Sequence, residues 1–466
     1  MVYFIEVQEK NLLVSPKLFY YIGMNTTNLV PRGFYRTTIL IGLGFFTLGL
    51  MDPLYDAYVP LFLGDYLSSR FLIGLIMTLD NVFALFLIPL VAALSDRTKT
   101  SIGRRMPYII VTLPLSAIFF MLLPSGALPR GSLMTLIVLL FLLNLAKQAS
   151  RGPVVALMPD LTDKNYRSQA NGVINFMGGI AAIVGTVALA PLIDVDLTLP
   201  LFGSTLRSLP FLISGVLVIV ATLALFVFVK EPRNSLRQGT TDDEREKQVP
   251  LRESIQRIFG VGSQNDTSGR YVLLALFFWF LGYQGVLPFI TTYSRDVLGT
   301  TEGLAGLSPG AVAIAYAIFV IPSGILAGQI GRRKVIRLSL LGIIIVMSLI
   351  YFHYPLSRAF GLDVTTSWMS FLGLLFFFGM FWGSVVTNSF PMLWHMASYE
   401  TMGIYTGMYY LFSQGAAITA PVLAGGFIDW GTYVLGPTGG LRTMFLFAVL
   451  CMSIALGFML KVTRES

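Results

Sequence analysis

Charged, thiol and imidazole side chains are scarce in this chain of 466 residues. Only 12% of the residues are charged, whereas soluble domains carry about 25%. A single cysteine, Cys451, and two histidines argue against a disulfide framework and against a Cys/His metal site. No nucleophile with a partner base is evident, and the phosphate-binding pattern GxxxxGKS or GxxxxGKT is missing. We therefore expect no enzyme, no metal centre and no cofactor beyond a coupling cation, H⁺ or Na⁺.

Long apolar runs take the place of charge. A helix needs about 20 residues to cross a hydrocarbon layer of about 30 Å, and twelve runs approach or exceed that length. They cover residues 37–62, 71–94, 106–123, 132–153, 169–193, 209–229, 271–292, 310–330, 335–354, 368–391, 403–425 and 441–460. The predicted fold class is an all-α integral membrane protein with twelve transmembrane helices.

A long polar stretch divides these spans six and six. We predict a cytoplasmic tail (1–36), a six-helix bundle (37–230), a cytoplasmic linker (231–269) and a second six-helix bundle (270–466). The strings FLIP (86–89) and FVIP (319–322) recur near the ends of the second and eighth spans, each before an arginine-rich turn. This repeat favours two parallel halves with a substrate site between them near mid-membrane.

The net charge of +8 indicates orientation rather than a nucleic-acid partner. With the N-terminus inside, only six of the 32 Lys and Arg residues fall in outer segments, and all but one of the others fall in cytoplasmic segments. Such an excess on one side follows the positive-inside rule. We expect a multi-pass monomer in the lipid bilayer of the plasma (inner) membrane, with both termini cytoplasmic.

Three strings carry a family resemblance: SDRTKTSIGRRMPYI after the second span, RGPVVALMPDLTDKNYRSQANG at the end of the fourth, and LYDAYVPLFL in the first. They resemble the signatures of the glycoside-pentoside-hexuronide cation symporters and the related sucrose carriers of the major facilitator superfamily. The resemblance covers the N-terminal half well. It implies the major facilitator fold of two six-helix bundles and cation-coupled transport of a sugar.

The resemblance also implies a gate at the turn after the second span, which would latch the cytoplasmic side while the carrier faces outward. Guanidinium groups there can pair with carboxylates and helix ends of neighbouring helices. The alternative is that the arginines only set topology. The candidate gating residues, including the GQIGRR turn of the second half, are Asp96, Arg97, Gly103, Arg104, Arg105, Arg332 and Arg333.

Ionisable side chains within spans are costly and therefore point to function. Asp80 falls near the middle of the second span, where it predicts ion coupling or substrate binding, the alternative being a structural hydrogen bond. Asn81 beside it is a candidate substrate ligand. Lys147 shares a helix face with Arg151, and we expect Lys147 to form an ion pair in the cavity, with Asp80 as a candidate partner.

Two further carboxylates, Asp52 and Asp56, lie four residues apart in the first span. Their position in its outer third predicts a solvated vestibule, with a role in ion coupling. Sucrose carriers have an aspartate and an arginine in the fourth span where this chain has Asn144 and Val155. We therefore assign coupling to Asp80 rather than to the fourth span.

A sugar site needs aromatic plates and amide or hydroxyl groups that face a cavity. By analogy with the superfamily, spans one, four, five, seven, ten and eleven line that cavity. The candidate substrate ligands are Asn81, Asn171, Asn175, Trp279, Tyr283, Gln284, Trp382, Asn388, Tyr409 and Gln414.

These observations predict a secondary carrier that moves a sugar or glycoside with H⁺ or Na⁺ by alternating access. Its small-molecule substrate is not identified by the sequence. Efflux of an amphiphile remains open within transport, because Phe and Met are abundant (36 and 19 residues). A membrane sensor that binds ligand without transport remains open as another class.

Overall fold

The computed structural model describes residues 33–127, 131–199, 203–231, 268–396 and 402–463. Most of the predicted N-terminal tail and linker lies outside these residues. The described chain is almost wholly helical, and its one sheet is a two-residue hairpin of β1 (Thr198–Leu199) and β2 (Gly203–Ser204). Eleven helical segments of the described chain are long and apolar enough to cross a membrane.

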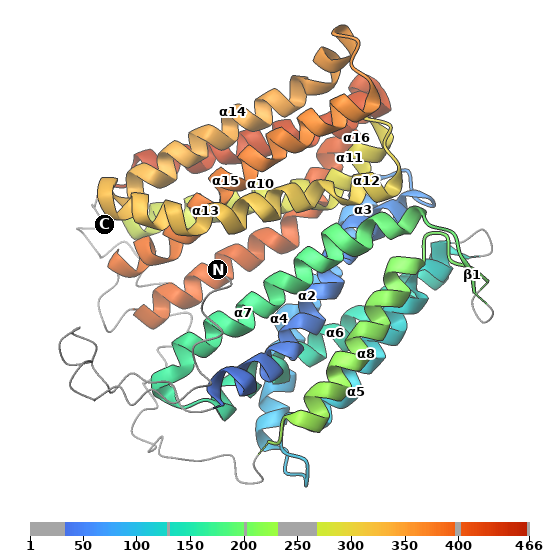
Figure 1. Cartoon of the computed structure of the whole chain (residues 1–466). Helices are drawn as coiled ribbons and strands as arrows, with labels where there is room; N and C mark the ends of the chain where they lie inside the picture. The colour runs from blue at the N-terminus through green and yellow to red at the C-terminus, as the bar shows by residue number, and fades with distance from the viewer. Residues whose placement is uncertain (1–32, 128–130, 200–202, 232–267, 397–401, 464–466) are drawn as a thin grey trace, which may run out of the picture.

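The helices fall into two groups, one from each half of the chain (Figure 1). The N-terminal group contains α2 (Phe34–Gly64), α3 (Arg70–Met77), α4 (Leu79–Arg97), α5 (Met106–Leu122), α6 (Leu133–Leu161), α7 (Arg167–Ile183) and α8 (Leu209–Phe228). Short helical turns join these helices: η2 (Leu123–Ala127) extends α5, and η3 (Lys164–Tyr166) precedes α7. Two further turns, η4 (Val184–Leu189) and η5 (Ala190–Asp194), extend α7. The C-terminal group contains α10 (Ser268–Val286), η7 (Leu287–Phe289), α11 (Ile290–Asp296), α12 (Glu302–Gly306), α13 (Ser308–Ile330), α14 (Arg332–Ala359), α15 (Val364–Met396) and α16 (Met402–Leu460).

The last helix accounts for two of the predicted spans. Its 59 residues would extend about 90 Å, nearly three times the hydrocarbon thickness. The helix is broken at Gly436, whose φ of 76° is non-helical, so the chain turns back and crosses again. The prediction of twelve membrane-spanning helices is thereby confirmed, although the sequence did not predict that residues 426–435 are helical.

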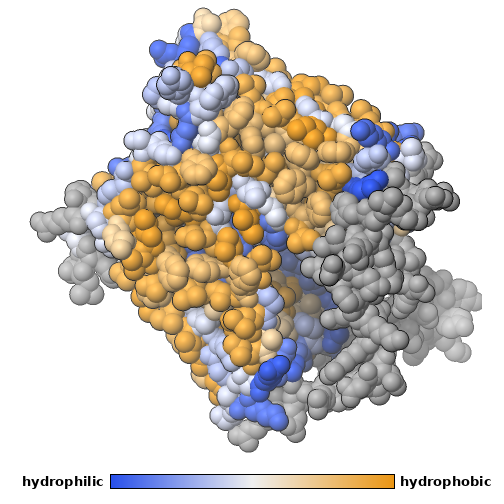
Figure 2. Space-filling view, turned by 180° about the vertical axis from the view of Figure 1, so that it is seen from behind, coloured by the Kyte–Doolittle hydropathy of each residue, from blue (hydrophilic) through white to orange (hydrophobic). Residues whose placement is uncertain are grey.

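Local sequence explains where several helices begin. Ser69 caps α3 by accepting a hydrogen bond from the backbone of Leu72, and Ser132 caps α6 in the same way through Thr135. α8 has Pro210 in its first turn, where the missing N–H removes no hydrogen bond. Hydrophobic residues cover the outer flanks of both groups (Figure 2), as expected of surfaces that face lipid.

The two groups meet at one end of the molecule, and we call this the closed end. There α3 packs on α16, and α12 packs on η5, which bring the labels α3, α11 and α12 together in Figure 1. A Cβ on Gly74 would overlap the carbonyl of Pro421, and one on Gly425 would overlap the carbonyl of Arg70. The backbones therefore approach closely because both positions are glycine.

The groups separate toward the opposite, open end. Figure 2 shows a hollow between them, with hydrophilic residues deep inside and hydrophobic flanks on either side. The structure is therefore one conformation of a two-body molecule, closed at one end and hollowed from the other.

Candidate functional site

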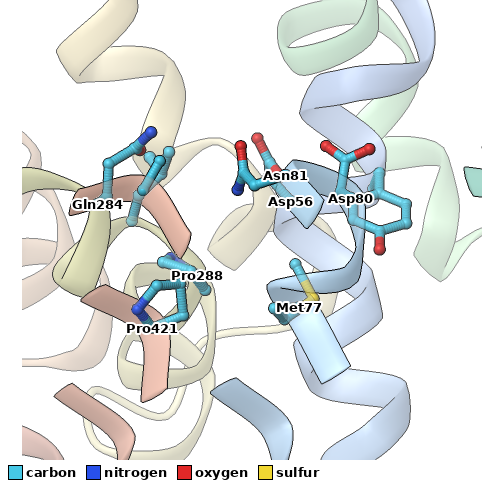
Figure 3. Close-up of a pocket in the computed structure, with 10 residues that line it drawn as sticks. Asp56, Met77, Asp80, Asn81, Gln284, Pro288 and Pro421 are labelled. Atoms are coloured by element: carbon cyan, nitrogen blue, oxygen red, sulfur yellow. The ribbon is translucent and has the colours of Figure 1, made fainter. Parts of the chain in front are cut away.

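A cavity of about 110 Å³ lies between the two halves (Figure 3). The N-terminal half contributes Tyr55, Asp56, Met77, Asp80 and Asn81, and the C-terminal half contributes Gln284, Leu287, Pro288, Ala417 and Pro421. Four predicted residues thus face one space from opposite sides: Asp56, Asp80, Asn81 and Gln284. A polar cavity shared by both halves is where a small hydrophilic ligand can contact both of them.

A buried ion cluster adjoins this cavity. The Lys147 ammonium lies 3.0 Å from a carboxylate oxygen of Asp52 and 3.1 Å from one of Asp80, and its side chain is only 3% exposed. It also lies 4.7 Å from the ring centre of Tyr55. The predicted contact between Lys147 and Asp80 is confirmed. We refer to Asp52, Asp80 and Lys147 as the Lys147 cluster.

Neighbouring amides of α6 support this cluster. Gln148 donates a short hydrogen bond to Asp80, and Asn144 donates to the Tyr55 hydroxyl at 2.9 Å. Residues 144, 147, 148 and 151 recur at helical spacing and therefore share one face of α6. In the sequence Asn144 stands out only as a departure from a family pattern, and Gln148 and Tyr55 are not among the predicted site residues. The helical spacing of polar residues in an apolar run was the signal that could have found them.

The structure places the two carboxylates of the first span differently from the prediction. Asp52 belongs to the Lys147 cluster and Asp56 lines the cavity, so neither lies in an outer vestibule. α2 extends to Gly64, eight residues or about 12 Å beyond Asp56, and the closed end covers that part. Among the described residues Asp56 has no hydrogen-bond or ion-pair partner.

The four aromatic candidates include one stacked pair, Tyr283 and Trp382, and none of the four is among the residues that line the cavity. Tyr283, next to Gln284, stacks on Trp382 with ring centres 4.1 Å apart and planes within 4°. Trp279 is 0% exposed and packs inside the C-terminal half, so the structure does not bring it to the cavity. Its ring lies one turn earlier on α10, where that helix packs tightly on α16.

The remaining substrate candidates are also away from the cavity. Asn388 is buried and donates to Ser384 of its own helix, and Tyr409 is buried against the Ser389 hydroxyl. The other three do not line the cavity: Asn171 and Asn175 are exposed on α7, and Gln414 is half-buried on α16.

The predicted gating turn is tied together by ion pairs within the N-terminal half. Asp160 at the end of α6 receives Arg104 at 2.6 Å and Arg105 at 2.9 Å. Arg105 also contacts Asp96, and its backbone N–H donates to Glu231 at 2.8 Å. Gly103 has a φ of 109°, which suits the tight turn between them.

The other three predicted gating arginines, Arg97, Arg332 and Arg333, take no part in these ion pairs, and Arg333 contacts a helix end instead. Arg97 is exposed. In the C-terminal half Arg332 is half-buried, and Arg333 donates to the carbonyls of Val462 and Thr463. Pairing with a neighbouring helix end is the kind of contact that the gate hypothesis requires, and the latch itself stays a prediction.

A second ion network joins the halves at the closed end, and the sequence did not predict it. Arg207 lies 2.7 Å from Asp65 of its own half and 2.9 Å from Glu302 of the other, and Glu302 also receives Arg295 at 3.0 Å. Arg207 has a φ of 63°, the one positive φ among the described non-glycine residues. Such strain costs about 1–2 kcal/mol and commonly marks a functional position.

Asp429 of α16 completes this closed-end network by capping α3 from the opposite half. Its carboxylate accepts from the Ser69 hydroxyl at 2.6 Å and from the N–H groups of Arg70 and Phe71 at 2.7 and 3.0 Å. The Arg70 side chain in turn reaches Asp296 of the C-terminal half at 3.3 Å. Separation of the halves at this end would break all of these contacts together.

Comparison with known proteins agrees with this architecture. A family model described as Major Facilitator Superfamily matches residues 41–421 and 272–466. A 56-residue stretch is 41% identical to the "Inner membrane transport protein YajR" of Escherichia coli (strain K12), a match that covers 12% of each chain.

Solved structures show the same fold over nearly the whole chain. A bacterial homologue of the human lysosomal transporter Spinster, in an inward-facing and occupied conformation, matches 94% of this chain and 98% of its own at 15% identity, with a TM-score of 0.68. The nucleoside transporter NupG matches 91% of this chain and 99% of its own at 14% identity, with a TM-score of 0.64. A bacterial homologue of the iron transporter ferroportin matches 93% and 100% at 14% identity, with a TM-score of 0.65. Identities this low show the fold alone.

Proposed function

The chain belongs to the Major Facilitator Superfamily and is a multi-pass membrane transporter, and from that premise we propose that it imports a sugar or glycoside together with protons. The observation that carries this proposal is the Lys147 cluster, three ionisable groups in contact beside a polar cavity between the two halves. Ionisable groups are retained within spans where water, an ion or a ligand reaches them.

The asymmetry of the two ends supports transport by alternating access. The closed-end network holds the halves together at one end, while the gating turn at the other end pairs within its own half. With the termini in the cytoplasm, the closed end is the outer one and this conformation opens inward. Transport then requires the closed-end network to break and the gating turns of the two halves to approach.

The position of Lys147 in the Lys147 cluster favours a proton over a sodium ion as the coupling ion. Lys147 already occupies the space between Asp52 and Asp80, where a sodium ion would need their oxygens. A proton needs only one carboxylate. Protonation of Asp80 would release Lys147 toward Asp52 and free the side-chain amide of Gln148, which changes the polar wall that faces the substrate.

A hydrophilic substrate is favoured over an amphiphile by the groups around the cavity. Asp56, Asp80, Asn81 and Gln284 line the cavity and provide acceptors and donors for hydroxyl groups. Tyr283, which adjoins Gln284 along α10 and stacks on Trp382, is the aromatic group next to this lining in the chain. Sugars present hydroxyl edges and a weakly apolar face, which suit such a lining.

The test is gradient-dependent uptake of labelled sucrose and lactose, with a labelled lipophilic cation in parallel, by protein reconstituted into vesicles. The Asp80→Asn variant should retain sugar counterflow but lose stimulation by an imposed proton gradient. Asp163→Asn, the same change at an exposed position outside the site, should behave like the unaltered protein. Full coupling in Asp80→Asn would remove Asp80 from the mechanism. Uptake of the lipophilic cation alone would favour the efflux alternative, and binding without counterflow would indicate a sensor.

A further inference from the structure

The charges around the cavity do not balance, and the imbalance falls on Asp56. The Lys147 ammonium lies within 3.1 Å of both other carboxylates, Asp52 and Asp80. Arg151, one turn farther along α6, acts on Asp52. Asp56 is left without a hydrogen-bond or ion-pair partner among the described residues, although it lines the cavity.

Asp56 is half-buried on the cavity wall, where water solvates its carboxylate less well than in bulk, so a cationic ligand that enters the cavity is favoured beside it. The charged groups that act on Asp56 are Asp52, Asp80 and Lys147, of which two repel it. The repulsion adds to the demand for positive charge at this position. Anionic substrates would be repelled, because the cavity wall already carries Asp56 and Asp80.

The wall opposite Asp56 suits an organic cation better than a bare ion. Figure 3 shows Asp56 and Asn81 on one side of the cavity and Gln284 on the other. Tyr283 adjoins Gln284, stacks rigidly on Trp382, and lies near enough to Asp56 to interact with it electrostatically. An aromatic face beside a carboxylate is a common arrangement for binding ammonium groups.

We propose that Asp56 recognises a protonated amine on the transported solute, so that the substrate is an amino sugar or a similar hydroxylated amine. The inference rests on the proposed function for the cavity and narrows its substrate class. Asp56 pairs with the ammonium group, the amides of Asn81 and Gln284 hydrogen-bond the hydroxyl groups, and the Lys147 cluster remains the proton-coupling element.

Four related sugars test which substrate charge the cavity prefers: D-glucosamine is cationic, D-glucose and N-acetyl-D-glucosamine are neutral, and D-glucuronate is anionic. Their binding to the purified full-length protein is measured by isothermal titration at pH 6.5, where the glucosamine amine is protonated. We expect glucosamine to bind about tenfold to a hundredfold more tightly than glucose, since one charge-assisted pair supplies that difference. N-acetylglucosamine should behave like glucose, and glucuronate should bind most weakly.

The Asp56→Asn variant keeps the side-chain shape and should bring glucosamine and glucose within about threefold of each other. Asp56→Glu, which restores the charge, should recover a preference for the amine, and Asp163→Asn should leave it unchanged. An equal affinity of the unaltered protein for glucosamine and glucose, or no binding of any of the four sugars, would overturn the inference.

Counterflow in vesicles separates this result from the proposed function. Counterflow of sucrose or lactose without any preference for an amine would sink the inference and leave the sugar carrier standing. Loss of proton stimulation in Asp56→Asn with sugar affinities unchanged would make Asp56 a proton site and would likewise overturn the inference. Specific binding of glucosamine without counterflow would support the amine site and contradict transport.

Discussion

The cap that Asp429 places on α3 predicts how strongly the closed end is held. Asp429→Ala removes three hydrogen bonds between the halves, from Ser69, Arg70 and Phe71. Because water can satisfy the freed groups once the halves separate, each bond is worth about 1 kcal/mol net, or about 3 kcal/mol in all. The partly exposed ion pairs nearby contribute only about 0–1 kcal/mol each. The cap therefore outweighs any single pair, and its loss shifts the equilibrium toward opening by about a hundredfold.

Cysteine labelling measures this shift directly. Ala190 of η5 is 1% exposed, and η5 packs on α12 of the other half, where the Ala190 side chain faces Gly306. With the native Cys451 replaced by alanine, Ala190→Cys should react with a hydrophilic maleimide only when the closed end opens. In lipid nanodiscs, which expose both ends, adding Asp429→Ala should accelerate labelling by about a hundredfold.

The matched control is Asp363→Ala. Asp363 also accepts hydrogen bonds at a helix start, but its partner Thr366 belongs to the same helix, α15. Its removal should leave the labelling rate of Ala190→Cys unchanged. Labelling in Asp429→Ala that stays within about threefold of the unaltered protein, with equal thermal stability, would refute the role of this cap.

Three further substitutions test other contacts. Gly74→Ala places a methyl group against the Pro421 carbonyl, so it should force the closed end apart and raise the same labelling rate. Lys147→Ala leaves two carboxylates without their cation and should lower the free energy of unfolding by about 3–5 kcal/mol, measured in detergent, with recovery when both carboxylates also become amides. Arg105→Lys loses the guanidinium geometry that pairs with Asp160 and should cost about 1–3 kcal/mol in the same assay.

The sequence predicts the helices well because the cost of unpaired backbone groups in lipid leaves few alternatives. The predicted sixth span, 209–229, differs from α8 by a single residue. The contact of Lys147 with Asp80 was also predictable, since two opposite charges within spans are tolerable when they meet. The part played by Asp52 was not, because the limits of an apolar run do not fix the depth of a residue when its helix continues beyond the run.

The closed-end network had no sequence signal of its own. Arg207 and Glu302 are separated by 95 positions, and Asp429 lies 359 positions from Arg70. Charges at the ends of apolar runs are expected in any membrane protein, so the positive-inside count treated Arg207 as a topology marker. Only the packing of the halves shows which of these charges meet.

Ligand binding in the cavity and closure of the closed end must influence each other, and the direction of this effect can be predicted. A ligand that enters from the open end binds the conformation in which Asp429 caps α3, so its apparent affinity is reduced by the fraction of molecules in other conformations. If Asp429→Ala reduces the fraction of molecules closed at this end to one tenth, every ligand of this conformation should bind about tenfold more weakly, whatever its charge. Asp56→Asn should instead weaken only the ligands that carry an amine, because it removes one contact and leaves the conformational equilibrium in place. Reciprocity requires that a ligand which binds this conformation also slow the labelling of Ala190→Cys. A uniform loss of affinity with slower labelling on ligand addition identifies the conformational effect, and a loss confined to amines identifies the contact.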